Sequence, residues 1–112
     1  MRSRFSLPAQ DRQARSRLLQ SLGRGDPVLK ASLVAMARLC GKPRCRCGRG
    51  HKHVSWYLSA RVGGRRAMIY LPPALEAAAR QWVANGRAVE GWLRQMSEAS
   101  LERLLARKEA KP

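Results

Sequence analysis

The central part of this sequence lacks acidic side chains. No Asp or Glu occurs between Asp26 and Glu76, although ten Lys and Arg residues fall within that interval. Over the 112 residues, 23 Lys and Arg stand against only 7 Asp and Glu, which gives a net charge of +16. Charge segregated in this way repels itself in a compact state and is typical of a surface that binds a polyanion. Nucleic acid is therefore the first class of partner to consider.

Signatures of catalysis, secretion and membrane insertion are also missing. The sequence has no phosphate-binding glycine loop, no dinucleotide-binding glycine fingerprint, no serine nucleophile motif and no carboxylates in its central third. We therefore expect a protein that is not an enzyme and has no small-molecule substrate. The first residues lack the apolar run of a secretory signal, and no stretch is long and apolar enough to span a bilayer. The expected location is intracellular, with no membrane partner.

Cysteine is scarce, and all of it lies in one short segment, CGKPRCRCGRGHKH, at residues 40–53. Cys40, Cys45 and Cys47 are followed there by two histidines. Three thiolates and one imidazole form the closed tetrahedral shell that structural zinc prefers. The glycines of the segment permit tight turns, and the segment offers nothing from which a hydrophobic core could form. We therefore predict a structural Zn²⁺ ion bound by the three cysteines and one histidine.

The fourth ligand of this predicted site is either His51 or His53. We favour His53 because it lies where the chain straightens into a strand, so that the ligand would connect the metal loop to a sheet. The alternative is that the cysteines are reduced thiols without a metal and that the histidines simply extend a basic segment. A disulfide framework fits less well, because the cysteine count is odd and Cys45 and Cys47 are too close for an easy bridge.

The clearest secondary-structure signal is a β-hairpin. Residues 54–61 and 65–71 flank Gly63-Gly64, a pair that suits a two-residue type I′ turn. The resulting register separates the side chains into two distinct faces. The apolar face consists of Trp56, Leu58, Ala60, Ala67, Ile69 and Leu71. The polar face consists of Tyr57, Ser59, Arg61, Arg66, Met68 and Tyr70.

The remaining elements complete an α+β fold. A lone hairpin is marginally stable, so we predict a third strand near residues 33–39, although the alanine, leucine and methionine there also suit a helix. Residues 8–22 have the apolar periodicity of a short amino-terminal helix. Pro72-Pro73 open a longer helix that is expected to reach about Met96, and the leucines beyond it continue this helix or follow a kink. The predicted fold is a small antiparallel sheet with a zinc loop, backed by the long carboxy-terminal helix.

Three parts are predicted along the chain. Residues 1–27 form a basic amino-terminal arm and helix, residues 28–96 a zinc-stabilised sheet and helix module, and residues 97–112 a helical extension. The apolar stripe of the last helix continues through Asn85-Gly86, so we expect one helix with a weak point there. That stripe could pack on the amino-terminal helix, on a second copy of the chain or on a helper protein.

Several of these segments together resemble an uncharacterised bacterial domain family. They are CGKPRCRC, a following histidine, WYLS, a Gly-Gly turn and YLPPALEAAARQWVANGR, within residues 32–108. Members of that family typically read CGKP-x-C-x-C, HGP, YYLS, GG and VPPEL, and they are often encoded near transposases and other mobile elements. The resemblance implies that Cys40, Cys45, Cys47 and His53 occupy the family's Cys and His positions. It also implies a DNA-linked role in a bacterial cytoplasm or nucleoid.

The predicted function is nucleic-acid binding, with duplex DNA favoured over RNA, by an accessory or regulatory factor of a mobile element. A two-stranded ribbon fits the major groove, where arginine can read guanine, and further cations including Lys42 would hold phosphates. The residues predicted to contact nucleic acid are Arg44, Arg46, Arg49, Lys52, Tyr57, Arg61, Arg65 and Arg66. The alternatives are an RNA-binding protein and an adaptor whose carboxy-terminal helix binds a transposase-like partner or forms a homodimer.

Overall fold

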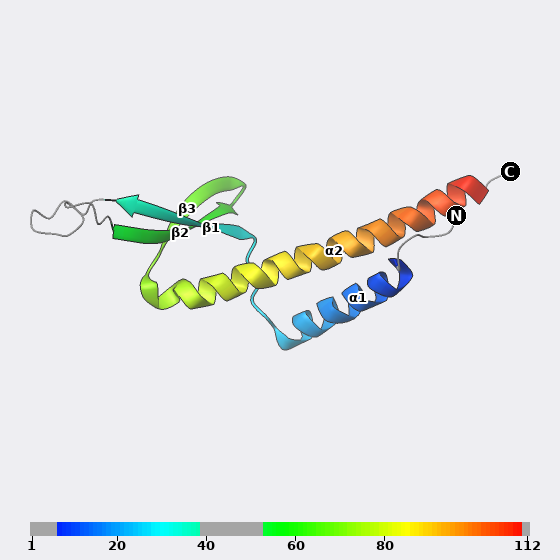
Figure 1. The fold of residues 1–112 in the computed structure, drawn as a ribbon, viewed down its shortest axis with the longest axis horizontal. Coiled ribbons are helices and arrows are strands. Elements are labelled where there is room, and N and C mark those ends of the chain that lie inside the picture. The colour runs from blue at the N-terminus through cyan, green and yellow to red at the C-terminus, as the bar shows by residue number, and fades with distance from the viewer. Residues whose placement is uncertain (1–6, 39–52, 111–112) are drawn as a thin grey trace, which may run out of the picture. The chain divides into compact units, whose positions relative to one another are not determined.

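The chain folds into a three-stranded antiparallel sheet, a short amino-terminal helix and a long carboxy-terminal helix, which confirms the predicted α+β class (Figure 1). The computed structural model describes residues 7–38 and 53–110, and all structural statements below concern these residues. The elements are α1 (Leu7–Arg24), β1 (Ala31–Arg38), β2 (His53–Val62), β3 (Arg65–Leu71), the 3₁₀ turn η2 (Pro73–Leu75) and α2 (Glu76–Ala110).

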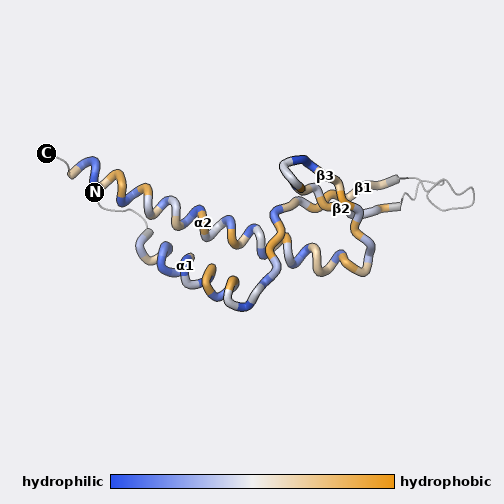
Figure 2. The backbone as a smooth tube through the Cα atoms, turned by 180° about the vertical axis from the view of Figure 1, so that it is seen from behind, coloured by the Kyte–Doolittle hydropathy of each residue, from blue (hydrophilic) through white to orange (hydrophobic). Residues whose placement is uncertain are grey.

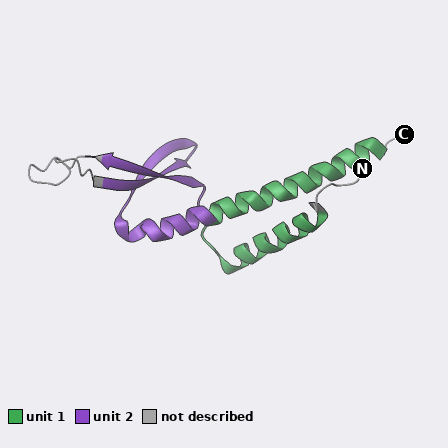
Figure 3. Cartoon of the chain, in the orientation of Figure 1, with its two compact units in different colours: residues 1–27, 85–112 green, residues 28–84 purple. Residues whose placement is uncertain are grey.

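These elements belong to two compact units (Figure 3). Residues 28–84 contain the sheet and the first turns of α2, and we call them the sheet unit. Residues 1–27 and 85–112 contain α1 and the rest of α2, and we call them the helical unit. The predicted interaction surfaces can therefore be examined one unit at a time.

The sheet has the strand order β1–β2–β3. Strand β3 pairs with β2 from Trp56 opposite Leu71 to Arg61 opposite Arg66, which is the predicted register. The predicted third strand is also confirmed, because Ala31–Arg38 pairs with β2 along its whole length. Its alanine, leucine and methionine content suits a helix in isolation, but pairing with β2 and packing of one face outweigh these weak intrinsic preferences.

The core of the sheet unit lies on the predicted apolar face. Leu58 and Leu71 are buried there against Ala79 and Val83 of α2. The partly buried residues around this core are Leu29, Ala31, Leu33 and Trp56. Along α2, hydrophobic and hydrophilic residues alternate in short stretches (Figure 2), as expected of a helix that buries one side only. The first turns of α2 therefore cover one face of the sheet.

Helix α2 includes the leucines beyond Met96, which is one of the two predicted alternatives. Proline at the start of η2 and Glu76 in the first turn of α2 suit a helix amino terminus, and Arg80 pairs with Glu76 at 3.1 Å. The helix then passes through Asn85-Gly86 without a break, as predicted, and ends at Ala110. The Asn85 side-chain amide donates a hydrogen bond to the Pro27 carbonyl at 2.9 Å. This bond connects α2 to the segment that follows α1. None of the described helices is long and apolar enough to cross a membrane.

In the helical unit, α1 runs antiparallel to the second part of α2. Asp11 near the start of α1 lies 3.8 Å from Arg103, whereas Pro27 beyond the end of α1 contacts Asn85. Ala14 and Ala99 are almost completely buried in this unit. Small residues at these positions allow two helices to approach closely.

The end of α1 is fixed by a Schellman motif. Gly25 has φ of 72°, its amide donates to the Leu22 carbonyl, and the Asp26 amide donates to the Ser21 carbonyl. The Arg24 guanidinium donates hydrogen bonds to the Asp26 carboxylate and holds the pKa of that carboxyl below its usual value. The buried Ser21 hydroxyl donates to the same carboxylate at 3.1 Å. The helix therefore stops at a defined residue before the chain turns towards β1.

The turn between β2 and β3 provides a first test of the fold. Gly63 and Gly64 have φ of 59° and 82°, as the predicted type I′ turn requires. A Cβ atom at either position would meet no atom within 4 Å, so the cost of adding one comes from the backbone alone. We expect Gly64→Ala to lower the free energy of unfolding by about 1 to 2 kcal/mol, measured by urea denaturation followed by circular dichroism.

Gly23 of α1 serves as the matched control. A Cβ atom added there would likewise meet no atom within 4 Å, but Gly23 lies in a helix and has no positive φ. Alanine is a better helix former than glycine, so Gly23→Ala is expected to leave stability unchanged or raise it by up to about 1 kcal/mol. Equal destabilisation by the two substitutions would contradict the turn assignment.

Candidate nucleic-acid interface

Three arginines predicted to contact nucleic acid lie at the exposed end of the β2–β3 hairpin, which Figure 2 shows as hydrophilic. Arg61 and Arg66 are cross-strand partners and share a face, whereas Arg65 pairs with Val62 and falls on the other face. Like charges directly opposite each other destabilise a sheet. None of the three arginines forms an ion pair with a carboxylate of the described residues. The positive charge at this end of the hairpin is therefore not compensated by the described residues.

Two of these guanidinium groups are held in place by the hairpin itself. Arg61 Nη1 donates to the Gly64 carbonyl at 3.0 Å, and Arg66 Nη1 donates to Ser59 Oγ at 2.7 Å. Each arginine keeps further N–H donors for another partner, because a guanidinium carries five. Their side chains are therefore oriented before any ligand arrives, which reduces the entropy lost on binding.

The same face of the sheet carries an aromatic pair. Tyr57 and Tyr70 are cross-strand partners whose ring centroids lie 5.6 Å apart at an interplanar angle of 66°, an edge-to-face arrangement. Tyr70 is 51% exposed and Met68 is 50% exposed. We call this surface the open face; it consists of Ser32, Val34 and Met36 of β1 with Tyr57, Ser59, Arg61, Arg66, Met68 and Tyr70. None of these residues is buried.

The sheet unit has almost no negative charge to oppose its cations. Its sequence contains eleven Lys and Arg residues but a single carboxylate, Glu76. That carboxylate accepts hydrogen bonds from Arg80, and the Arg80 guanidinium lies 4.3 Å from the ring centre of Trp56. Glu76 is thus occupied within α2, and its partner covers an aromatic side chain of the apolar face. The arginines of the hairpin are left without an acidic neighbour among the described residues of this unit.

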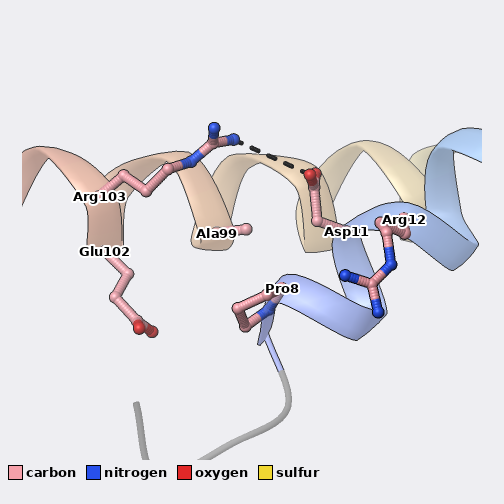
Figure 4. Close-up of a pocket in the computed structure, with 6 residues that line it drawn as sticks. All are labelled: Pro8, Asp11, Arg12, Ala99, Glu102 and Arg103. Atoms are coloured by element: carbon pink, nitrogen blue, oxygen red, sulfur yellow. Dashed lines mark ion pairs between the residues drawn. The ribbon is translucent and has the colours of Figure 1, made fainter. Parts of the chain in front are cut away.

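The helical unit contains a small pocket of about 250 Å³ (Figure 4). The residues that line it are Pro8, Asp11, Arg12, Ala99, Glu102 and Arg103. The Asp11 side chain, 13% exposed, pairs with Arg15 at 3.0 Å and with Arg103 at 3.8 Å. Its carboxylate is therefore engaged by two guanidinium groups and connects α1 to α2, which is a structural role.

Comparison with known families provides an assignment. The family described as a domain of unknown function (DUF6788) matches residues 8–81, about two thirds of the chain. The chain belongs to this family. No curated protein and no solved structure matches the chain. The predicted membership of an uncharacterised domain family is thus confirmed, over a range that begins earlier and ends earlier than the segments noticed in the sequence.

The DUF6788 match includes α1, the whole sheet and the first turns of α2. It therefore covers the hairpin arginines and the open face. The predicted phosphate-binding cations Lys42, Arg44, Arg46, Arg49 and Lys52 fall inside the same range but outside the described residues. Their participation stays a prediction. What the structure does establish is that the connection carrying them begins and ends at paired residues, Arg38 and His53.

The predicted zinc ion requires a correction. Among the described residues, no group of three or more His, Cys, Asp or Glu side chains could hold a metal ion. A structural zinc site needs four ligands, and the described part of the chain contains only one of those predicted, His53, at the start of β2. Cys40, Cys45 and Cys47 lie outside the described residues, as does His51. The described residues therefore contain no zinc site, and their sheet is explained by strand pairing and its own core.

Two residues of the candidate interface, Ser59 and Tyr70, were not among the predicted contacts. Ser59 and Tyr70 were placed on the polar face but were assigned no binding role. The period-2 pattern revealed their face, whereas the hydrogen bond from Arg66 to Ser59 and the exposure of Tyr70 depend on side-chain conformation. An aromatic residue directly opposite Tyr57 in the predicted register was the signal that could have identified Tyr70.

Proposed function

We propose that this protein binds nucleic acid through its sheet unit. The observation that carries the proposal is the concentration of eleven Lys and Arg residues beside one carboxylate, Glu76, which Arg80 already neutralises. Cations gathered in this way repel one another, and a phosphate polymer relieves the repulsion and releases its own counterions. The exposed and oriented side chains of Arg61 and Arg66 support the same proposal.

Each group of residues has a proposed role. Arg61, Arg65 and Arg66 bind phosphates or base edges at the end of the hairpin. Tyr57 lies on the face of Arg61 and Arg66 and contributes an aromatic ring to the binding surface. The cations of the connection between β1 and β2 add phosphate contacts. Duplex DNA is the polymer that the sequence favours, and RNA remains an alternative that phosphate contacts alone cannot distinguish. We assign the protein no catalytic role.

The biological setting is part of the same proposal. An accessory or regulatory role beside a mobile element is supported by the resemblance of the cysteine box and the Tyr-Leu-Pro-Pro segment to sequences encoded near transposases. A location in the bacterial cytoplasm, with association to the nucleoid, follows if the polymer is DNA. Imaging of a tagged chain in cells with and without nucleoid condensation would test this location.

The electrostatic basis of the proposal predicts a steep salt dependence. If Lys42, Arg44, Arg46, Arg49 and Lys52 alone engage phosphates of duplex DNA, log affinity should fall against log salt with a slope of about −4 to −5. Contacts from the hairpin arginines would steepen it further. Titrating a labelled duplex with the full chain at several salt concentrations measures the slope. A slope near zero would refute phosphate binding as the mode of recognition.

An adaptor function is the second candidate, and it rests on a different observation. The helical unit leaves large apolar side chains exposed, namely Leu19, Leu22, Leu93, Leu101, Leu104 and Leu105. Exposed leucines in such number are typical of a surface that binds another protein or a second copy of the chain. Measuring the molecular mass in solution with and without nucleic acid separates the two functions. A tight oligomer that ignores nucleic acid would favour the adaptor.

A further inference from the structure

We propose that the open face binds single-stranded nucleic acid, with an unpaired base stacked on Tyr70. This inference rests on the proposed nucleic-acid binding, but it assigns a single strand to the open face in place of the duplex that the sequence favours. The two faces of the sheet differ in what covers them. Ala79 and Val83 of α2 pack on the apolar face, whereas none of the open-face residues is buried by the described residues of the sheet unit.

The aromatic pair has the properties of a stacking platform. Every base has a flat π surface, and a base that stacks on an exposed aromatic ring gains affinity regardless of its sequence. Tyr70 offers such a ring, because it is 51% exposed and lies on β3 beside Tyr57. The edge-to-face contact with Tyr57, at 5.6 Å between ring centres, supports the Tyr70 ring from one side. A supported ring loses little freedom when a base stacks on it.

Positive charge is available on the same face at a suitable distance. Arg66 lies four residues from Tyr70 along β3, which is about 13 to 14 Å in a strand. At about 3.4 Å for each stacked nucleotide, four nucleotides or fewer cover this interval. One short strand can thus stack a base on Tyr70 while its phosphates reach the guanidinium groups of Arg66 and Arg61. Both guanidiniums are already oriented by Ser59 and the Gly64 carbonyl.

The third strand makes a duplex a poorer fit to this surface. A major groove about 12 Å wide admits a helix or a two-stranded ribbon. Here β1 accompanies β2 as far as Ala60, so the ribbon projects beyond β1 only by Arg61, Val62 and the turn. Directly behind this short projection, β1 adds a third strand, which widens the ribbon by about 4.8 Å. The bases of a duplex also hide their faces from Tyr70, whereas unpaired bases expose them.

The test compares single-stranded and duplex oligonucleotides of the same length. The full chain is titrated, at one salt concentration, with fluorescent oligothymidylate, oligouridylate and a mixed-sequence duplex of about 12 nucleotides or base pairs. We expect a single strand to bind at least about tenfold more tightly than the duplex. Tyr70→Ala should weaken single-strand binding about tenfold or more, because the stacked base loses its platform. The salt slope of this variant should stay unchanged, since no charge is removed.

Tyr70→Phe is the matched control, because it keeps the ring and removes only the hydroxyl. Its affinity for the single strand should stay within about twofold of the original protein if stacking is the cause. Circular dichroism verifies that both variants remain folded. Duplex binding as tight as single-strand binding, with no effect of Tyr70→Ala, would overturn the stacking platform but leave the proposed function intact. If none of the three polymers binds in a salt-dependent way, both the stacking platform and the proposed function are overturned.

Discussion

Replacing Leu58 by alanine is expected to lower the free energy of unfolding of the sheet unit by about 2 to 5 kcal/mol. Leu58 is 8% exposed and belongs to a core whose other buried members, among the described residues, are Leu71, Ala79 and Val83. A unit formed by residues 28–84 has a total stability on the order of 3 to 8 kcal/mol, so one cavity removes a large part of it. Urea denaturation followed by circular dichroism measures the loss.

Ile69 provides the control for this prediction. It lies opposite Leu58 in the register and belongs to the same face, but it is 42% exposed. Because water already reaches this side chain, Ile69→Ala removes less buried apolar area and should cost less than about half as much. A similar loss of stability for the two variants would mean that the buried core is not centred on Leu58.

Removing the charges of Arg65 and Arg66 together should weaken nucleic-acid binding about 10- to 100-fold while the fold persists. Both side chains are exposed at the end of the hairpin, and neither forms an ion pair with a carboxylate of the described residues. Substituting both by serine should also make the slope of log affinity against log salt shallower by about 2, one for each lost phosphate contact. Fluorescence titration at several salt concentrations gives both values.

Two arginines of the helical unit provide a control that distinguishes the effect of the hairpin charges on affinity from the effect of the overall charge. Arg15 pairs with Asp11 at 3.0 Å, and Arg94 pairs with Glu98 at 4.0 Å. Substituting Arg15 and Arg94 by serine removes two positive charges, as the hairpin variant does, but from the helical unit. We expect this double variant to bind within about twofold of the original protein. Equal weakening by the two double variants would show that the overall charge of the chain, and not the hairpin, determines affinity.

The sheet was predictable because its signals are local and mutually consistent. Gly63-Gly64 fixed the turn, and the alternation from Trp56 to Leu71 then allowed only one register, which the structure has. Residues 31–38 were harder, because their composition suits a helix and only pairing with β2 makes them a strand. That strand was predicted from the instability of an isolated hairpin, which is an argument about the whole sheet.

The sequence was less informative where a feature depends on distant parts of the chain or on side-chain conformation. Helix α2 continues beyond Met96 to Ala110 as one helix, whereas the apolar pattern alone was also compatible with a kink. The zinc prediction relied on the composition and ligand spacing of one segment and on a family resemblance, whereas the sheet holds together through Leu58, Leu71 and their neighbours on α2. The orientation of the hairpin arginines by Ser59 and Gly64 could not be read from the sequence, because it depends on rotamers.

The pairing of Arg38 with His53 has a consequence for how the chain can vary. These two residues hold the ends of the intervening connection side by side in the sheet. The entropy of closing a loop grows only with the logarithm of its length, so even a doubling costs about 0.6 kcal/mol. Insertions or deletions between these two residues should therefore leave the strand pairing almost undisturbed. We therefore expect the length and sequence of the segment between Arg38 and His53 to vary without loss of the sheet.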